Sequence, residues 1–383
     1  MISSKLPNVG ISIFSEMTKM ANKYSAINLS QGFPGFNCSE RLIELVNKYM
    51  NKGLNQYAPM EGVLQLREKI VEKTEFLYGH KYDTQKEVTV TAGATQAIYT
   101  AISAFVKEKD EVIVFEPAFD CYVPAILING GYPVYIQLKP PYYRIDWEEV
   151  RKAVSSRTRM IIINTPHNPT GMVMLKDDFE HLQKIAGSSR IIVLSDEVYE
   201  HIVFDGLKHN SVSMFPGLVE NSLVISSFGK TYHTTGWKIG YCLSPEKLMS
   251  EFRKVHQFIV YAVNTPIQYA YAEFLEEKEN YLDLPIFYET KRNLFNTLLN
   301  ESKFRIIPSQ GTYYQLLNYS FISDEKDIDI TGILTQNYGV TPIPLSVFYH
   351  ENTDNKVLRF CFAKPDETLK EAAERLSRFK FLK

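Results

Sequence analysis

The chain has 383 residues, of which 45% are hydrophobic and 22% charged, so it is long and apolar enough to bury a large core. Its 42 basic and 44 acidic residues give a net charge of −2. A nearly neutral chain has no global field to hold nucleic acid or an anionic membrane surface, and we expect neither partner.

The four cysteines lie far apart and show no zinc-ligand spacing, which favours reduced thiols and no structural metal. The N-terminal segment MISSKLPNVGISIF has no signal-peptide pattern. No apolar run reaches the roughly 18 residues that a membrane span needs. These features together predict a cytoplasmic protein.

Short apolar runs and amphipathic segments alternate through the middle of the chain. Each run is rich in Val and Ile and ends at a polar, loop-like cluster. Such runs, separated by helical patterns, predict an α/β fold with a mostly parallel sheet flanked by helices. The clusters should then meet in one crevice beyond the carboxyl ends of the strands. The predicted strands are 88–91, 112–115, 160–163, 191–194 and 223–225.

The pattern changes near Leu284. A long helix, two strands (GTYYQLLNY and KVLRFCF) and a final charged helix predict a smaller α+β domain at 285–383. The large domain is then expected at 40–284. Residues 1–39 form a loop-rich N-terminal arm that we expect to join the small domain.

Lys230 follows the predicted strand 223–225, in SSFGKTYHTTGWKIG. Ser226, Ser227 and Gly229 keep this loop small and polar, which leaves space for a ligand. A lysine at the end of a buried strand suits an enzyme that forms a Schiff base, once its amine is desolvated or placed near another cation. The alternative is an ordinary surface lysine in a turn.

Two further loop clusters carry candidate ligand-binding residues. In SDEVYEH, Asp196 either caps a helix or pairs with a ligand cation such as a pyridinium nitrogen. Tyr199 can then hydrogen-bond the phenolate oxygen of the same ring. In NTPHNPTG, two X-Pro steps and a glycine predict a stiff turn, in which Asn168 is either structural or a second donor to that oxygen.

A candidate anion site lies where the strand 88–91 is followed by a helix. Ala94 and Thr95 would present free backbone N–H groups at its N-terminus. Lys238 either pairs with a phosphate there or is a solvated surface charge. Phe119, in EPAFDCY, is either a core residue or stacks on a cofactor.

Arg359 lies within the apolar strand VLRFCF, where an unpaired guanidinium is unfavourable. Its carboxylate partner is either internal, in a salt bridge, or belongs to a ligand.

Together these segments resemble the fold-type I aminotransferases that depend on pyridoxal 5'-phosphate (PLP). The matching motifs occur in the family's order and cover nearly the whole chain. Within the family the chain is similar to the kynurenine/glutamine transaminase K branch. QYAPMEG, GKTYHTTGWKIGYC, FIVYAVNTPIQ and IPLSVF most resemble the bacterial methionine aminotransferases of that branch. The other matching segments are NLSQGFPGF, TAGATQA, EPAFDCY, NTPHNPTG, SDEVYEHI and LRFCFAK.

The resemblance implies a role for each candidate residue. Lys230 forms the internal aldimine and moves the proton, Asp196 pairs with the pyridinium nitrogen, and Tyr199 completes the catalytic set. Tyr57, in NQYAP, reaches the phosphate in the partner subunit, so the active unit is a homodimer. Lys238 stands where arginine is usual in the wider family, which replaces a two-pronged phosphate contact by a point charge. The remaining contacts are Tyr199 and Asn168 with the ring oxygen, Phe119 on the ring, Ala94, Thr95, Ser227 and Lys238 with the phosphate, and Gly32, Asn168 and Arg359 with the substrate α-carboxylate.

The resemblance also implies a ping-pong transamination between an apolar, sulfur-containing or aromatic L-amino acid, methionine favoured, and a 2-oxo acid. No second arginine is evident for a distal carboxylate. Phe14, Phe33 and Tyr261 are either walls of an apolar side-chain pocket or ordinary core residues. Two alternatives stay open: a C–S β-lyase of the same fold, which would share Lys230 and Asp196, and a PLP-binding protein without catalysis.

Overall fold

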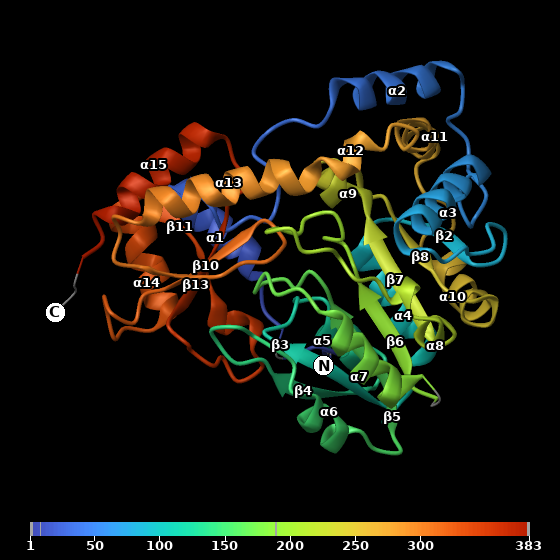
Figure 1. Ribbon diagram of the computed structural model, residues 1–383, viewed down its shortest axis with the longest axis horizontal. Coiled ribbons are helices and arrows are strands. Elements are labelled where there is room, and N and C mark those ends of the chain that lie inside the picture. The colour runs from blue at the N-terminus through green and yellow to red at the C-terminus, as the bar shows by residue number, and fades with distance from the viewer. Residues whose placement is uncertain (1–2, 8, 188–189, 381–383) are drawn as a thin grey trace.

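The computed structural model describes residues 3–7, 9–187 and 190–380 and contains two main sheets (Figure 1). The larger sheet has seven strands in the order β2-β8-β7-β6-β5-β3-β4. β8 is antiparallel to both of its neighbours, β2 and β7, and the other four pairings in this sheet are parallel, so the predicted mostly parallel sheet is confirmed. Its strands are β2 (Val88–Thr91), β3 (Glu111–Glu116), β4 (Tyr132–Gln137), β5 (Thr158–Asn164), β6 (Ile192–Asp196), β7 (Ser222–Ser227) and β8 (Gly240–Leu243).

Alternate side chains of the central strands enter two different cores. Along β5, Ile161 and Ile163 pack into the larger core, whereas Met160 and Ile162 pack into the smaller one. Both faces of the sheet are therefore buried under helices, which explains why these strands read as continuous apolar runs. The helices in this part of the chain are α2 (Glu40–Asn51), α3 (Leu64–Tyr78), α4 (Ala94–Phe105), α5 (Tyr122–Ile128), α6 (Trp147–Ala153), α7 (Lys176–Ala186), α8 (Pro216–Val219), α9 (Phe228–Thr231), α10 (Glu246–Ile259), α11 (Thr265–Phe274) and α12 (Glu279–Leu282).

The second main sheet is antiparallel, with the order β12-β13-β10-β9. The long helix α13 packs against the C-terminal helix α15 beside it (Figure 1). The strands of this sheet are β9 (Arg305–Ile307), β10 (Tyr314–Asn318), β12 (Ile343–Pro344) and β13 (Val357–Cys361). The helices in this part of the chain are α13 (Leu284–Leu299), α14 (Asp327–Ile333) and α15 (Asp366–Ser377).

The N-terminal segment lies against this second part of the chain. Strand β1 (Ile27–Asn28) pairs in parallel with β11 (Val340–Thr341), and helix α1 (Ile13–Lys23) packs on both. The loop that follows β1 contacts both main parts of the chain, because Gly32 accepts a hydrogen bond from Lys230 and Ser30 accepts one from Arg359 on β13. The domain boundaries at residues 39 and 284 remain predictions.

Candidate active site

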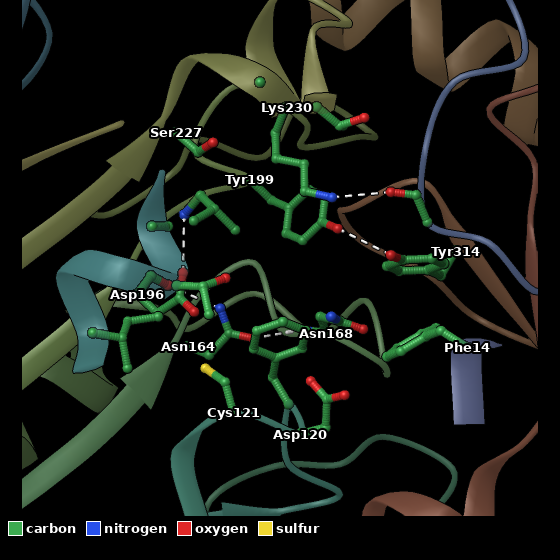
Figure 2. A pocket seen from close by; sticks show the side chains of 18 of the residues that line it. Phe14, Asp120, Cys121, Asn164, Asn168, Asp196, Tyr199, Ser227, Lys230 and Tyr314 are labelled. Carbon is green, nitrogen blue, oxygen red and sulfur yellow. Dashed lines mark hydrogen bonds between the residues drawn. The ribbon is translucent and has the colours of Figure 1, made fainter. Parts of the chain in front are cut away.

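A cavity of about 410 Å³ opens at the carboxyl ends of β5, β6 and β7 (Figure 2). The polar loops that follow the predicted strands therefore meet at one cavity, as expected for a parallel sheet. Ten of the sequence-predicted site residues line this cavity: Gly32, Ala94, Thr95, Phe119, Asn168, Asp196, Tyr199, Ser227, Lys230 and Lys238.

Lys230 extends into the cavity from the short helix α9, directly after β7. Its Nζ donates hydrogen bonds to the Gly32 carbonyl oxygen at 2.9 Å and to the Tyr313 hydroxyl at 2.8 Å. Burial lowers the pKa of Lys230 to about 8, and the positive charges of Arg359 and Lys238 act in the same direction. This lowered pKa raises the neutral, nucleophilic fraction of the amine near neutral pH far above that of an ordinary lysine.

Asp196 ends β6 and is buried. The Tyr122 hydroxyl donates to its Oδ2 at 2.5 Å, and the Val198 N–H donates to its Oδ1 at 3.3 Å. Burial raises the pKa of Asp196 to about 6, although the Tyr122 hydrogen bond opposes this shift. The chain continues from Asp196 into turns, so the helix-capping interpretation was wrong and the carboxylate faces the cavity.

Asn168 is positioned by a second asparagine at the end of β5. Its backbone N–H donates to the Asn164 Oδ1 at 2.7 Å, and the Asn164 Nδ2 donates to the Asp196 carbonyl at 2.9 Å. These bonds join the NTPHNPTG turn to the end of β6. The hydroxyl of Tyr199 donates to that of Tyr314 at 3.1 Å on the other side of the cavity.

One part of the cavity lining contains groups of the kind that bind anions. The first turn of α4 has backbone N–H groups without intrahelical acceptors, and its N-cap residue is Gly93, whose φ is +80°. A Cβ at Gly93 would lie 3.3 Å from the Lys238 Nζ, so the absence of a side chain lets the lysine approach the helix start. Ser227 lines the same cavity, which places a hydroxyl, an ammonium and helix N–H groups around one space.

Arg359 lies on β13 and is fully buried. Its guanidinium donates to the Asn168 Oδ1 at 2.8 Å and to the Ser30 carbonyl at 3.1 Å, and it stacks 3.9 Å from the centre of the Tyr314 ring. No carboxylate among the described residues lies within salt-bridge distance of it, and its Nε has no partner there. The described residues therefore offer no salt-bridge partner, and neutral acceptors hold the guanidinium instead.

Not every residue singled out in the sequence reaches this cavity. Phe14 lines it, but Phe33 lies partly exposed beneath the Lys364 ammonium. Tyr57 is 85% exposed and packs edge-on against Tyr261, outside the cavity of its own chain.

Several residues of the site were missed in the sequence. Asn164 and Tyr122 lie within the motifs NTPHNPTG and EPAFDCY, but both bond to Asp196, which ends β6. The sequence does not show these contacts, because they depend on how neighbouring strands lie in the sheet. Tyr313 lies directly before β10 and Tyr314 begins it, more than 80 residues after Lys230. Tertiary packing alone therefore brings Tyr313 to the Lys230 amine and Tyr314 to the cavity lining. Gln31 lines the cavity from the N-terminal segment.

This arrangement agrees with the comparison to known protein families. The model of the family "Aminotransferase class I and II" matches residues 24–376. The chain belongs to this aminotransferase family. It is 49% identical to the methionine aminotransferase of Escherichia coli K12 (97% of both chains) and 34% identical to the kynurenine–oxoglutarate transaminase of Dictyostelium discoideum (99% of this chain, 96% of the relative). The crystal structure of E. coli YbdL, identified with a methionine aminotransferase function, superposes with a TM-score of 0.97 at 48% identity, covering 99% of each chain.

Aminotransferases of this class depend on PLP, act on amino acids and 2-oxo acids, and commonly form homodimers. The residues of this cavity fit that cofactor. A lysine amine of lowered pKa, a buried carboxylate and an anion-binding corner all open on one space, and Gly93 leaves the corner free of a side chain. In the part of the chain that the structure describes, no helix has the length and apolar character needed to cross a membrane.

Proposed function

We propose that this aminotransferase transfers the amino group of an apolar, sulfur-containing or aromatic L-amino acid, methionine favoured, to a 2-oxo acid in a ping-pong cycle. The observation that carries the proposal is the cavity that Lys230 and Asp196 both line. The buried guanidinium of Arg359, which has no carboxylate partner among the described residues, is hydrogen-bonded to Asn168 in the lining of that cavity. The methionine aminotransferase activity of a relative that is 49% identical supports methionine as the donor.

PLP, when bound, supplies a carbonyl that condenses with amines and a ring that accepts the electron pair of a broken Cα–H bond. The residues proposed to hold it are those around the cavity. Asp196 keeps a proton on the ring nitrogen, Tyr199 and Asn168 bind the ring oxygen, and Phe119 stacks on the ring. The phosphate is held by Ser227, Lys238 and the N–H groups of Ala94 and Thr95.

The protein's part in the reaction is to bind, orient and move one proton. Arg359 and Asn168, with Gly32, fix the substrate α-carboxylate. The Lys230 amine takes the proton from the substrate Cα and holds it for return. Burial favours this task, because it lowers the pKa of that amine to about 8 and so keeps part of it neutral.

The cavity lining favours substrates without a second negative charge. Among the described residues that line it, the only cations are Lys230 and Lys238, both assigned to the cofactor. Arg359 lies behind the lining residues Asn168 and Tyr314 and is assigned to the α-carboxylate, so no lining cation is left for a second carboxylate. Phe14, Ile98 and Tyr314 supply apolar surface. One methylene in such a pocket changes binding by only about 1–3 kcal/mol, so we expect a broad range of apolar donors.

We further propose that Tyr57 completes the cavity of a partner subunit. Tyr57 and Phe258 are 85% and 86% exposed, and Tyr261 packs against Tyr57, which leaves an aromatic surface open on this chain. Covering that surface by a second copy would bury it and bring Tyr57 to the neighbouring phosphate.

A donor and acceptor screen tests the proposed reaction. Methionine without an acceptor should bleach the PLP absorption band, and a 2-oxo acid should restore it. Release of pyruvate and ammonia from a cysteine conjugate without any acceptor, with no bleaching by methionine, would favour the C–S β-lyase instead. Borohydride reduction and peptide mapping should place the cofactor on Lys230. A label elsewhere, or no bound PLP, would contradict the proposal.

A further inference from the structure

The amine of Lys230 meets two acceptors that are themselves joined. Tyr313 lies directly before β10 and is fully buried. Its hydroxyl accepts from the Lys230 Nζ at 2.8 Å and donates to the Gly32 carbonyl oxygen at 2.5 Å, while the same carbonyl accepts from the Nζ at 2.9 Å. Because the hydroxyl proton points to Gly32, the hydroxyl oxygen offers a lone pair to the amine.

The ring of Tyr313 is held by aromatic neighbours. It lies edge-on to Tyr199 at 5.1 Å between ring centres, and Tyr314 and Tyr288 contact it at 5.0 Å and 5.8 Å. These contacts come from three elements, so the hydroxyl has little freedom to move away from the lysine. The ring of Tyr313 also lies 5.4 Å from the Nζ.

A free lysine amine in this cavity needs such a partner. The lysine side chain has several rotatable bonds and would otherwise sample many positions. Two acceptors also favour the ammonium form, which opposes the effect of burial on its pKa. The other titratable and charged groups that act on this amine are Arg359, Lys238, Asp196 and Cys361, with the hydroxyls of Tyr199 and Tyr314 nearby.

We propose that Tyr313 is a positioning residue that, together with the Gly32 carbonyl, holds the Lys230 amine in place whenever that amine is not bound to the cofactor. The inference rests on the proposed function, in which the freed amine moves the substrate proton. A loosely held amine would still bind the cofactor but would transfer the proton slowly. Substrate binding should change little, because the Tyr313 hydroxyl bonds to Lys230 and to the Gly32 carbonyl and not to Arg359 or Asn168.

The test compares Tyr313→Phe with Tyr288→Phe in the PLP-loaded enzyme. Tyr288 is an equally buried tyrosine whose hydroxyl has no hydrogen-bond partner among the described residues, so its loss is the matched control. Tyr313→Phe should lower kcat for methionine at least tenfold with KM within twofold. The isotope effect on kcat with α-deuterated methionine should increase, because proton transfer becomes slower than other steps. Tyr288→Phe should leave all three values within twofold.

A second readout does not depend on turnover. In enzyme loaded with pyridoxamine phosphate, which cannot condense with an amine, acetylation of Lys230 is followed by mass spectrometry as a function of pH. Removing the Tyr313 acceptor should shift the midpoint to lower pH, and Tyr288→Phe should not. If wild type fails to transaminate methionine, the proposed function fails, whereas the midpoint still reports on the contact.

The outcomes separate a positioning role from a structural one. An unchanged kcat, an unchanged isotope effect or an unchanged midpoint in Tyr313→Phe overturns the proposal. Tyr313→Gln, which restores an acceptor oxygen, should recover part of the lost kcat and return the midpoint toward wild type. If Tyr313→Phe does not fold, Tyr313→Gln is compared with Tyr313→Leu in the same measurements, and equal values for the two overturn the proposal.

Discussion

The guanidinium of Arg359 donates a 2.8 Å hydrogen bond to the Oδ1 of Asn168, although 191 positions separate the two residues. Arg359 belongs to the four-stranded sheet, and Asn168 follows β5 of the seven-stranded sheet. Because the Asn168 backbone is itself bound by Asn164, the guanidinium is held in a fixed direction. The group that we propose to bind the substrate carboxylate is therefore positioned by residues from both sheets.

Arg359→Lys keeps the charge but loses the two-pronged geometry and the bond to Asn168. Hydrogen bonds to charged groups contribute about 1.5–3 kcal/mol, so we expect KM for methionine and for the 2-oxo acid to rise together by about 10- to 100-fold. Bound PLP should be largely retained. Steady-state kinetics with both substrates and the PLP absorbance check this.

Arg292→Lys is the matched control for that substitution. Arg292 on α13 forms a two-pronged pair with Asp205 at 2.7 and 2.6 Å and lies outside the cavity lining. The same chemical change there should lower the melting temperature and leave KM unchanged. If Arg359→Lys behaves like Arg292→Lys, the arginine is structural and the carboxylate site lies elsewhere.

Sharing of Tyr57 across a dimer predicts complementation between two inactive proteins. In a hybrid of Tyr57→Ala and Lys230→Ala subunits, one cavity would carry wild-type Lys230 from one subunit and wild-type Tyr57 from the other. Random reassembly of the two variants should then restore about a quarter of wild-type activity, since half of the dimers are hybrids with one intact site. If activity stays at the level of the separate variants, Tyr57 does not serve the neighbouring site.

Asp120 lines the cavity with its carboxylate facing inward (Figure 2). Burial raises its pKa, whereas the charge of Arg359 acts to lower it. Two like charges about 4 Å apart in water repel by about 1 kcal/mol, so a glutamate side chain should be disfavoured about fivefold relative to glutamine of the same shape. Asp120→Asn should remove this preference. The ratio of kcat/KM for the two donors measures it, and an unchanged ratio would show that Asp120 does not contact the substrate side chain.

The sequence predicts the central strands well because both of their faces are buried. The runs 88–91 and 160–163 lie within β2 and β5, and both GTYYQLLNY and KVLRFCF contain the expected strands. β4 was missed because it lies at the edge of the sheet, is only partly buried and contains Pro133. β8 was missed because four residues beginning with a glycine carry too little pattern.

The sequence predicts the site residues that directly follow a buried strand. It does not predict the residues that reach the site only through tertiary packing. Lys230 and Asp196 each follow a recognisable apolar run, so their convergence follows from parallel strands. Tyr122 and Tyr313 contact those two residues through side chains that read as core aromatics. No local pattern distinguishes a tyrosine that donates to Asp196 from one that fills space.

His233 predicts how stability depends on pH. Its ring packs against Phe36 and Phe287, and its Nε2 is buried without a hydrogen-bond partner among the described residues. Burial lowers the pKa of His233 to about 4, and the charge of Lys291 acts in the same direction. An unfolded histidine has a pKa near 6.5, so between these values the unfolded state binds more protons than the folded state.

The stability that a neutral His233 contributes is therefore complete above about pH 6.5 and is lost as pH falls to about 4, by up to about 3 kcal/mol. His233→Asn removes the titrating ring, and asparagine tolerates the φ of +58° at this position. The variant should be less stable than wild type at pH 7, because it loses ring packing, but its free energy of unfolding should fall less steeply between pH 6.5 and 4. Urea denaturation of both proteins across this range measures the two slopes. If the two free energies of unfolding change in parallel with pH, His233 does not have a lowered pKa in the folded protein. If they converge as the pH falls, protonation of the His233 ring is less favourable in the folded state than in the unfolded state.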